Sequence, residues 1–125
     1  MARSKYRNVA TVVDGVRYAS KAEARRAQEL KRMVQCGAYN KVERQPLFQL
    51  GDVRYRADFQ IWAKGDPWGD SWVEEVKGFE TPRFRLIKRL WRRYGPCRLV
   101  VLKRRSNEWA CEFIEGIGHD KADRG

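Results

Sequence analysis

The run Trp72–Gly78 constrains the fold most, because it combines a strand pattern with paired charges. Apolar and polar residues alternate, the valines are β-branched, and Gly78 ends the run, so we predict a strand. Side chains two apart on a strand share a face, so Glu75 and Lys77 would project together, roughly 6–7 Å apart along the chain. Glu74 would face the other way. An acid and a lysine on one face of a strand can bind a metal and polarise a nearby oxygen.

A second acid, Asp58, lies in the run Tyr55–Trp62, whose aromatic and β-branched residues also predict a strand. A hairpin centred on Asp66 and Pro67 would place Asp58 opposite Glu75, with Cβ atoms about 5 Å apart. Two facing carboxylates destabilise a sheet unless a cation lies between them, and two oxygen ligands on stiff strands suit Mg²⁺ or Mn²⁺. The alternative is that both acids are solvent-facing charges on an exposed antiparallel face.

The charge of the chain favours a polyanionic partner. The formal net charge is +11 and the pI is about 10, which points first to nucleic acid and second to an anionic membrane surface. No apolar run approaches the length of a membrane span, and no signal-peptide core follows Met1. We therefore expect a cytoplasmic protein.

The inventory of cysteine and histidine excludes several kinds of site. Cys36, Cys97 and Cys111 are odd in number and far apart, which argues against a disulfide framework and a zinc knuckle. His119 is the single histidine, so chemistry that needs a histidine pair or a Ser-His-Asp set is excluded.

The first part of the chain carries hairpin and helix signals. Asp14-Gly15 between residues 9–13 and 16–18 predicts a short hairpin. Ser20 opens a helix that runs to about Gln35, with Gly37 as its stop.

Glu23 in this helix has two interpretations. Ser20 and Glu23 have the spacing of a capping box, in which the Glu23 carboxylate bonds back to the Ser20 amide. Alternatively, Glu23 is a third acid that the helix presents toward Asp58 and Glu75.

The second part predicts strands around a further helix. An extended segment at Gln45–Leu50 precedes the strands of Asp58 and Glu75, which suggests a three-stranded meander. Thr81-Pro82 starts a helix that ends near Tyr94. The apolar run at 98–103 then predicts a buried strand, and strand–helix–strand order favours a parallel crossover.

The end of the chain is less regular. Residues 106–113 fit either a short helix or an edge strand. We expect a single domain over residues 1–115, followed by a disordered tail of mixed charge over 116–125.

The helix at 82–94 carries many cations and no acids. We expect these side chains to contact phosphate rather than only solvent. The predicted DNA-binding residues are Arg83, Arg85, Lys88, Arg89, Arg92 and Arg93.

The order of helix, strand with Asp, strand with Glu-X-Lys, helix and strand resembles the PD-(D/E)XK nuclease superfamily. In particular, it resembles small phage and prophage endonucleases and the phage junction-resolving endonuclease I. The resemblance extends roughly from Lys5 to Lys103, and Ala57 stands where the superfamily signature has proline. It implies an α/β fold with a restriction-endonuclease-like core, in which helices flank a central mixed sheet. The matching segments are Tyr18–Glu23, Gly37, Glu43–Pro46, Tyr55–Phe59 and Val73–Gly78.

The resemblance also implies roles for individual residues. Asp58 and Glu75 would be the metal ligands, and Lys77 would position or activate the attacking water. Glu23 would be the acid presented by the helix, as in junction-resolving members. Gln45 would lie near the site.

The function implied is that of a Mg²⁺- or Mn²⁺-dependent DNA endonuclease without a small-molecule cofactor. We expect a homodimer that cuts branched DNA, as a Holliday junction resolvase does, in phage DNA recombination or processing. A nicking or double-strand endonuclease without junction preference is an alternative. A non-catalytic basic nucleic-acid-binding protein is another, and a membrane-surface protein is a remote third.

Overall fold

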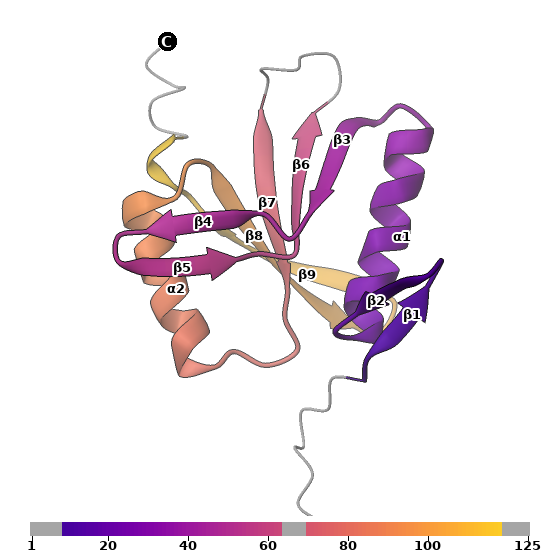
Figure 1. The fold of residues 1–125 in the computed structure, drawn as a ribbon, viewed down its shortest axis with the longest axis horizontal. Helices are drawn as coiled ribbons and strands as arrows, with labels where there is room; N and C mark the ends of the chain where they lie inside the picture. Colours follow the sequence, from indigo (N-terminus) through magenta and orange to yellow (C-terminus); the bar gives the residue numbers. More distant parts are fainter. Residues whose placement is uncertain (1–8, 64–69, 119–125) are drawn as a thin grey trace, which may run out of the picture.

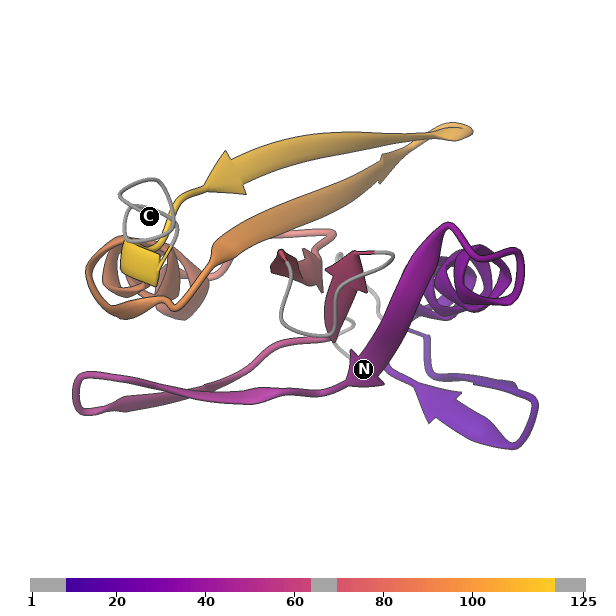
Figure 2. The ribbon, with the colours of Figure 1, turned by 90° about the horizontal axis from the view of Figure 1, so that it is seen from above.

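A computed structural model describes residues 9–63 and 70–118 of the 125-residue chain. Over these residues the protein has a mixed α/β fold, in which a central five-stranded sheet separates two helices (Figure 1 and Figure 2). The strand order is β3-β6-β7-β8-β9. The strands are β3 (Tyr39–Arg44), β6 (Phe59–Ala63), β7 (Ser71–Val76), β8 (Arg98–Arg105) and β9 (Glu108–Ile114).

The sheet is mixed because one neighbouring pair of strands is parallel. β7 and β8 run parallel and are joined by helix α2 (Pro82–Tyr94), which confirms the predicted crossover. The other neighbouring pairs are antiparallel. The Thr81 hydroxyl accepts a hydrogen bond from Phe84 N (3.1 Å) and Pro82 occupies the first turn, so the sequence signal for the helix start is confirmed.

Helix α1 (Lys21–Gln35) covers the opposite face of the sheet. It follows a hairpin of β1 (Thr11–Val13) and β2 (Val16–Tyr18), which is the hairpin predicted from Asp14-Gly15. Both turn residues have positive φ, 51° and 77°, as a two-residue hairpin loop requires.

The predicted meander is wrong, because the run Tyr55–Trp62 is not one strand. It is divided at Ala57 and Asp58 between β5 (Val53–Arg56) and β6, and β4 (Leu47–Leu50) pairs with β5 in a separate two-stranded sheet. β3 therefore pairs with β6 instead. Backbone hydrogen bonds close the base of the β4–β5 hairpin, from Gln45 N to Asp58 O (2.8 Å) and from Ala57 N to Pro46 O (3.0 Å).

Two apolar cores lie on the two faces of the sheet. The core on the α2 side joins the β4–β5 hairpin and the sheet to the helix through residues such as Tyr55, Val73 and Trp91. The core on the α1 side includes Leu30 and Phe59. Because side chains alternate along a strand, β7 contributes to both cores.

The end of the described chain is an ordered edge of the fold. Residues 108–114 form edge strand β9, so the strand alternative for 106–113 is confirmed. Gly116 is buried and Ile117 N donates to Gly95 O (2.8 Å), so order extends to Gly118, past the boundary predicted at residue 115. Residues 119–125, which include His119, lie outside the described residues. Within the described ranges, no helix is long and apolar enough to cross a membrane.

Candidate active site

The register between β6 and β7 brings Asp58 to Glu75. Phe59 pairs with Glu74 and Gln60 with Val73, so one further step places Asp58 opposite Glu75, which is the predicted alignment. The turn predicted at residues 66 and 67 lies outside the described residues. Asp58 Oδ2 accepts a hydrogen bond from Val76 N (2.7 Å), which fixes the carboxylate against β7 and leaves Oδ1 for another partner.

The Glu75 carboxylate is held by two neighbouring side chains. It is only 6% exposed, so the alternative of a solvent-facing acid is wrong for this residue. The Tyr55 hydroxyl donates to Oε1 (2.5 Å), and Lys77 Nζ lies 3.3 Å from Oε2. Lys77 Nζ also lies 4.6 Å from the centre of the Phe84 ring. The acid and the lysine predicted to share a face are therefore in contact.

The two acids repel each other in a poorly solvated place. Burial, then the charges of Glu75 and Glu23, raise the pKa of Asp58 from 3.8 to about 8. Burial also raises the pKa of Glu75, although Lys77 and the Tyr55 hydroxyl act in the opposite direction. A further cation beside the pair would favour the form in which both acids are ionised.

Glu23 lies close enough to this pair to act on both carboxyl groups. It is 5% exposed, and its charge contributes to the raised pKa of Asp58 and of Glu75. The Ser20 cap is formed, but it uses the backbone of Glu23, whose N–H donates to Ser20 Oγ (3.1 Å). Within the described part of the chain, the Glu23 carboxylate makes no return bond to the Ser20 amide and pairs instead with Arg44 Nη2 (3.5 Å). The carboxylate is thus free of the capping role.

Residues 44 and 45 border the acids, in different ways. The guanidinium of Arg44, which was not predicted, also lies over the Tyr18 ring at 4.5 Å. Gln45 has a positive φ of 54° and contacts Asp58 through its backbone N–H, while its side chain is exposed. Gln45 therefore shapes the turn beside Asp58, and among the described residues its side-chain amide makes no hydrogen bond to the acids.

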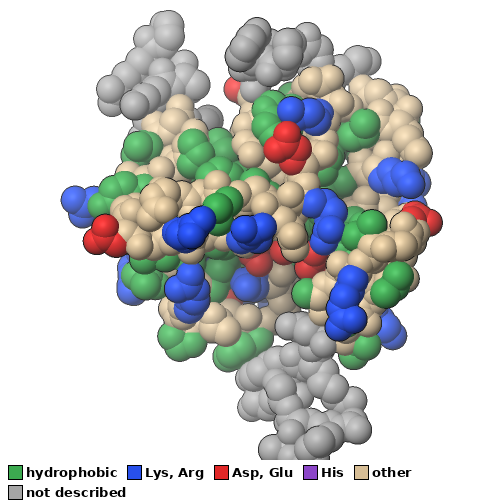
Figure 3. Space-filling model, viewed as in Figure 1, with side chains coloured by type: hydrophobic (Ala, Val, Ile, Leu, Met, Phe, Trp, Pro, Cys, Tyr) green, Lys and Arg blue, Asp and Glu red, His purple; other side chains and the backbone are tan. Residues whose placement is uncertain are grey.

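A basic cavity of about 500 Å³ opens beside Glu75 and Lys77. The β4–β5 hairpin supplies Arg54 and Arg56, and α2 supplies Arg83. In Figure 3, acidic side chains lie in a recess bordered by Lys and Arg side chains, below the β4–β5 hairpin. The two arginines of β5 were missed, although their alternation in Val53–Arg56 is a visible signal that they share one face.

The cations predicted on α2 fall into three groups. Arg83 lines the cavity and donates to Arg54 O (3.1 Å), while Arg85 donates to Glu80 O (3.2 Å). Lys88 corrects the expectation that these cations lack acidic partners, because its ammonium contacts Glu80 (2.7 Å) and Glu112 (3.0 Å), which raises its pKa against the effect of burial. Arg89, Arg92 and Arg93 are exposed farther along the helix.

Glu74 lies on the other face of β7, as strand alternation predicts. Its carboxylate accepts two hydrogen bonds from Arg26 (2.7 and 2.8 Å) and one from Trp72 Nε1 (2.9 Å). Burial alone would lower the pKa of Arg26, yet the hydrogen bonds to Glu74 and Glu29 raise it. This ion pair fastens α1 to the sheet and does not belong to the candidate site.

The donor set fits a hard divalent cation. No group of three or more His, Cys, Asp or Glu side chains in residues 9–63 and 70–118 is arranged to hold a metal ion. Mg²⁺, however, commonly takes one or two carboxylates and completes its shell with water and substrate phosphate. Asp58 and Glu75 meet that smaller requirement, with Glu23 as a further oxygen donor nearby.

The fold and the site together define a mixed α/β protein in which a half-buried aspartate, a buried glutamate and a lysine lie together, with the last two lining a basic cavity. Comparison with known families assigns the chain to one of them. It belongs to the family described as Protein of unknown function (DUF1064), which it matches over residues 3–107. The match includes every residue of the candidate site. No curated protein and no solved structure matched the chain.

Proposed function

We propose that the protein is a metal-dependent DNA endonuclease of the PD-(D/E)XK type, with a restriction-endonuclease-like core. The observation that supports this is the alignment of Asp58 with Glu75, which lies with Lys77 at the wall of a cavity lined by cations. A structural role would favour neutral or singly paired groups, because burying like charges together costs free energy. A site for a cation and a phosphate explains both the acids and the surrounding arginines.

Each residue has a definable role in phosphodiester hydrolysis. Asp58 and Glu75 would hold Mg²⁺ or Mn²⁺, with Glu23 as an additional acid, and the bound ion would lower the pKa of water and neutralise charge on the phosphate. Lys77 would place a fixed positive charge where the transition state becomes more anionic. Tyr55 would orient Glu75 through its 2.5 Å hydrogen bond.

The arginines around the cavity would bind the DNA backbone. Arg54, Arg56 and Arg83 lie next to Glu75 and Lys77, so a phosphate bound by them would be close to the acids. Arg89, Arg92 and Arg93 would extend this contact along α2. Such binding does not depend on base sequence and weakens steeply with salt.

The substrate we favour is branched DNA, such as a four-way junction. Symmetric cutting of a junction needs two active sites, hence a homodimer. Phage DNA recombination in the bacterial cytoplasm is the setting that the resemblance suggests. A nicking or double-strand endonuclease is the alternative within the same chemistry, and a basic protein that binds nucleic acid without cleaving it is the alternative outside it.

The deciding experiment compares cleavage of a labelled four-way junction and a matched linear duplex, each with Mg²⁺, Mn²⁺ or EDTA. Glu75→Gln tests the acid pair and Lys77→Ala tests the lysine. Glu43→Gln is the control, since Glu43 is exposed on β3 and pairs with Lys41 (3.2 Å).

Paired cuts in the junction alone, absent with EDTA and with Glu75→Gln, would establish a junction-resolving nuclease. Equal cutting of both substrates would support a nuclease that has no preference for junctions. Binding without cleavage under all metal conditions would exclude the enzyme and leave the non-catalytic protein.

A further inference from the structure

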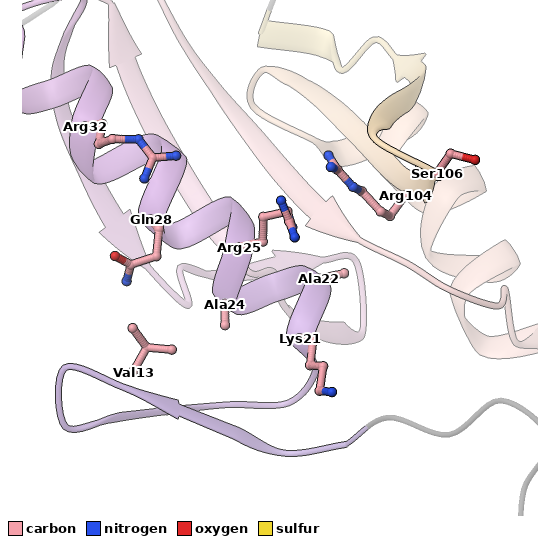
Figure 4. Close-up of a pocket in the computed structure, with 9 residues that line it drawn as sticks. All are labelled: Val13, Lys21, Ala22, Ala24, Arg25, Gln28, Arg32, Arg104 and Ser106. Carbon is pink, nitrogen blue, oxygen red and sulfur yellow. The ribbon is translucent and has the colours of Figure 1, made fainter.

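A second basic groove lies along helix α1, away from the cavity beside Glu75. It has a volume of about 600 Å³. Its cations are Lys21, Arg25 and Arg32 of α1 and Arg104 near the end of β8, with Ser106 in the following turn (Figure 4). None of these cations was among the predicted DNA-binding residues.

Three cations of α1 and the amide of Gln28 form one continuous stripe. Lys21, Arg25, Gln28 and Arg32 are spaced by four, three and four residues, which places them on one side of a helix. At 1.5 Å per residue, the stripe is about 16 Å long. Because one DNA strand carries a phosphate about every 3.4 Å of helix axis, this length corresponds to about five phosphates.

The far side of the groove is formed by Arg104. In Figure 4 the guanidinium groups of Arg25 and Arg104 point toward each other across the gap between α1 and the end of β8. The Arg104 guanidinium lies over the Trp109 ring at 5.0 Å, which orients it. Trp109 Nε1 in turn donates to Glu29 of α1 (2.8 Å). The β8–β9 turn is thereby held against the helix, so the two walls of the groove are fixed relative to each other.

The groove carries positive charge that the protein does not neutralise. Elsewhere on the same helix, Arg26 pairs with Glu74 and Lys31 with Asp14. In contrast, none of the four groove cations has an ion pair within the described residues, and no acid is among the groove's lining residues. Facing like charges repel, and a bound polyanion would relieve that repulsion.

We propose that this groove binds the sugar-phosphate backbone of nucleic acid. The proposal rests on the proposed function for the identity of the polyanion. α1 and α2 lie on opposite sides of the central sheet (Figure 2), so this surface is separate from the cations of α2. Lys21 and Glu23 lie in the same turn of α1 but on opposite sides of the helix, because two residues correspond to a rotation of about 200°. The groove and the cavity beside Glu75 share no lining residue, so a substrate that reaches both must pass around the first turn of α1, which suits DNA with more than one arm.

The test measures binding by fluorescence anisotropy of a labelled 20-base-pair duplex and of a four-way junction, in EDTA, over a range of KCl concentrations. EDTA separates binding from cleavage. The test variant is Arg25→Gln with Arg104→Gln, which removes two charges and keeps polar side chains. Arg25→Lys with Arg104→Lys restores the charges. Lys41→Gln with Arg98→Gln removes two charges that pair with acids elsewhere.

We expect the Gln pair to weaken binding and to lower the slope of log K against log salt by about 2, because two phosphate contacts are lost. The Lys pair should stay near the wild-type slope, and the Lys41/Arg98 control should change it by less than about 1. If the Gln pair shows the wild-type slope and normal cleavage in Mg²⁺, the groove does not bind DNA. The proposed nuclease activity would then still stand.

Two other outcomes would also overturn the proposal. Absence of DNA binding by the wild-type protein would remove the groove's ligand and the proposed function together. Unchanged DNA binding by the Gln pair, with loss of binding to vesicles that contain phosphatidylserine, would assign the groove to a membrane surface.

Discussion

Replacing Asp58 with Asn should stabilise the metal-free protein, and the gain should grow with pH. The pKa of this carboxyl group rises from 3.8 to about 8 on folding, chiefly because it is buried. An acid whose pKa is higher in the folded state holds its proton more tightly there. Ionisation therefore costs the wild-type protein stability as pH rises from about 4 to about 8, and the loss levels off above that range. Asn does not titrate and can still accept the hydrogen bond from Val76 N.

The size of this stabilisation follows from the difference between the two pKa values of Asp58. Since one pH unit corresponds to about 1.4 kcal/mol, the interval from 3.8 to about 8 sets an upper limit of about 6 kcal/mol. Glu75 and Glu23 share the repulsion, and water entering the metal-free site weakens it. We therefore expect about 2–3 kcal/mol above pH 8, which is about 8–12 °C in Tm for a chain of this size.

The assay is thermal unfolding in EDTA between pH 5 and pH 9. Asp52→Asn is the control, because Asp52 is exposed in the β4–β5 turn, and its Tm difference from wild type should not grow with pH. Adding Mg²⁺ should raise the Tm of wild type and have little effect on Asp58→Asn, since a ligand stabilises only the form that binds it. A Tm for Asp58→Asn at or below that of wild type at pH 8 in EDTA would refute the reasoning.

Three further substitutions test separate parts of the structure. Glu23→Gln should leave Tm within about 2 °C, because the Ser20 cap uses the backbone of residue 23. The same substitution should reduce cleavage, and full activity would show that Glu23 is not part of the site. Glu74→Gln should lower the free energy of unfolding by about 2 kcal/mol, because Arg26 loses the charge of Glu74 and keeps only that of Glu29. Chemical denaturation measures this, and a change under about 0.5 kcal/mol would contradict the role of the pair. Tyr55→Phe should raise the pKa of Glu75 further by removing its hydroxyl donor, so the cleavage–pH profile should move to higher pH; an unmoved profile would show that Tyr55 does not orient the acid.

The positions set by local signals could be predicted from sequence. Asp14-Gly15, Thr81-Pro82 and Gly37 each impose a backbone geometry that few other residues adopt, and the turn and helix boundaries follow them. The Asp58–Glu75 alignment was also predictable, because a hairpin register is fixed once its centre is chosen.

The departures arise where tertiary contacts override local pattern. Tyr55–Trp62 has strand character throughout, yet the chain joins the central sheet only at Phe59, because the β4–β5 hairpin packs Tyr55 against Trp91 of α2. Lys88 looks unpaired in sequence because its acids, Glu80 and Glu112, come from outside the helix. The groove on α1 depends on Arg104, which comes 83 residues after the helix start at Lys21, and no sequence spacing indicates that the two lie side by side.

The ion pair between Arg26 and Glu74 has a consequence for how the sheet finds its alignment. Each face of the segment Val73-Glu74-Glu75-Val76 carries one valine and one glutamate, so its hydrophobic pattern hardly distinguishes the correct pairing from one shifted by a residue. A shift exchanges the two faces of β7. In the shift that puts Glu74 opposite Asp58, Val73 would take the place of Glu74, and the half-buried Arg26 would keep only Glu29 as a counter-charge. We infer that the Arg26–Glu74 pair, on the face of β7 turned away from the acids, favours the register in which Asp58 and Glu75 meet.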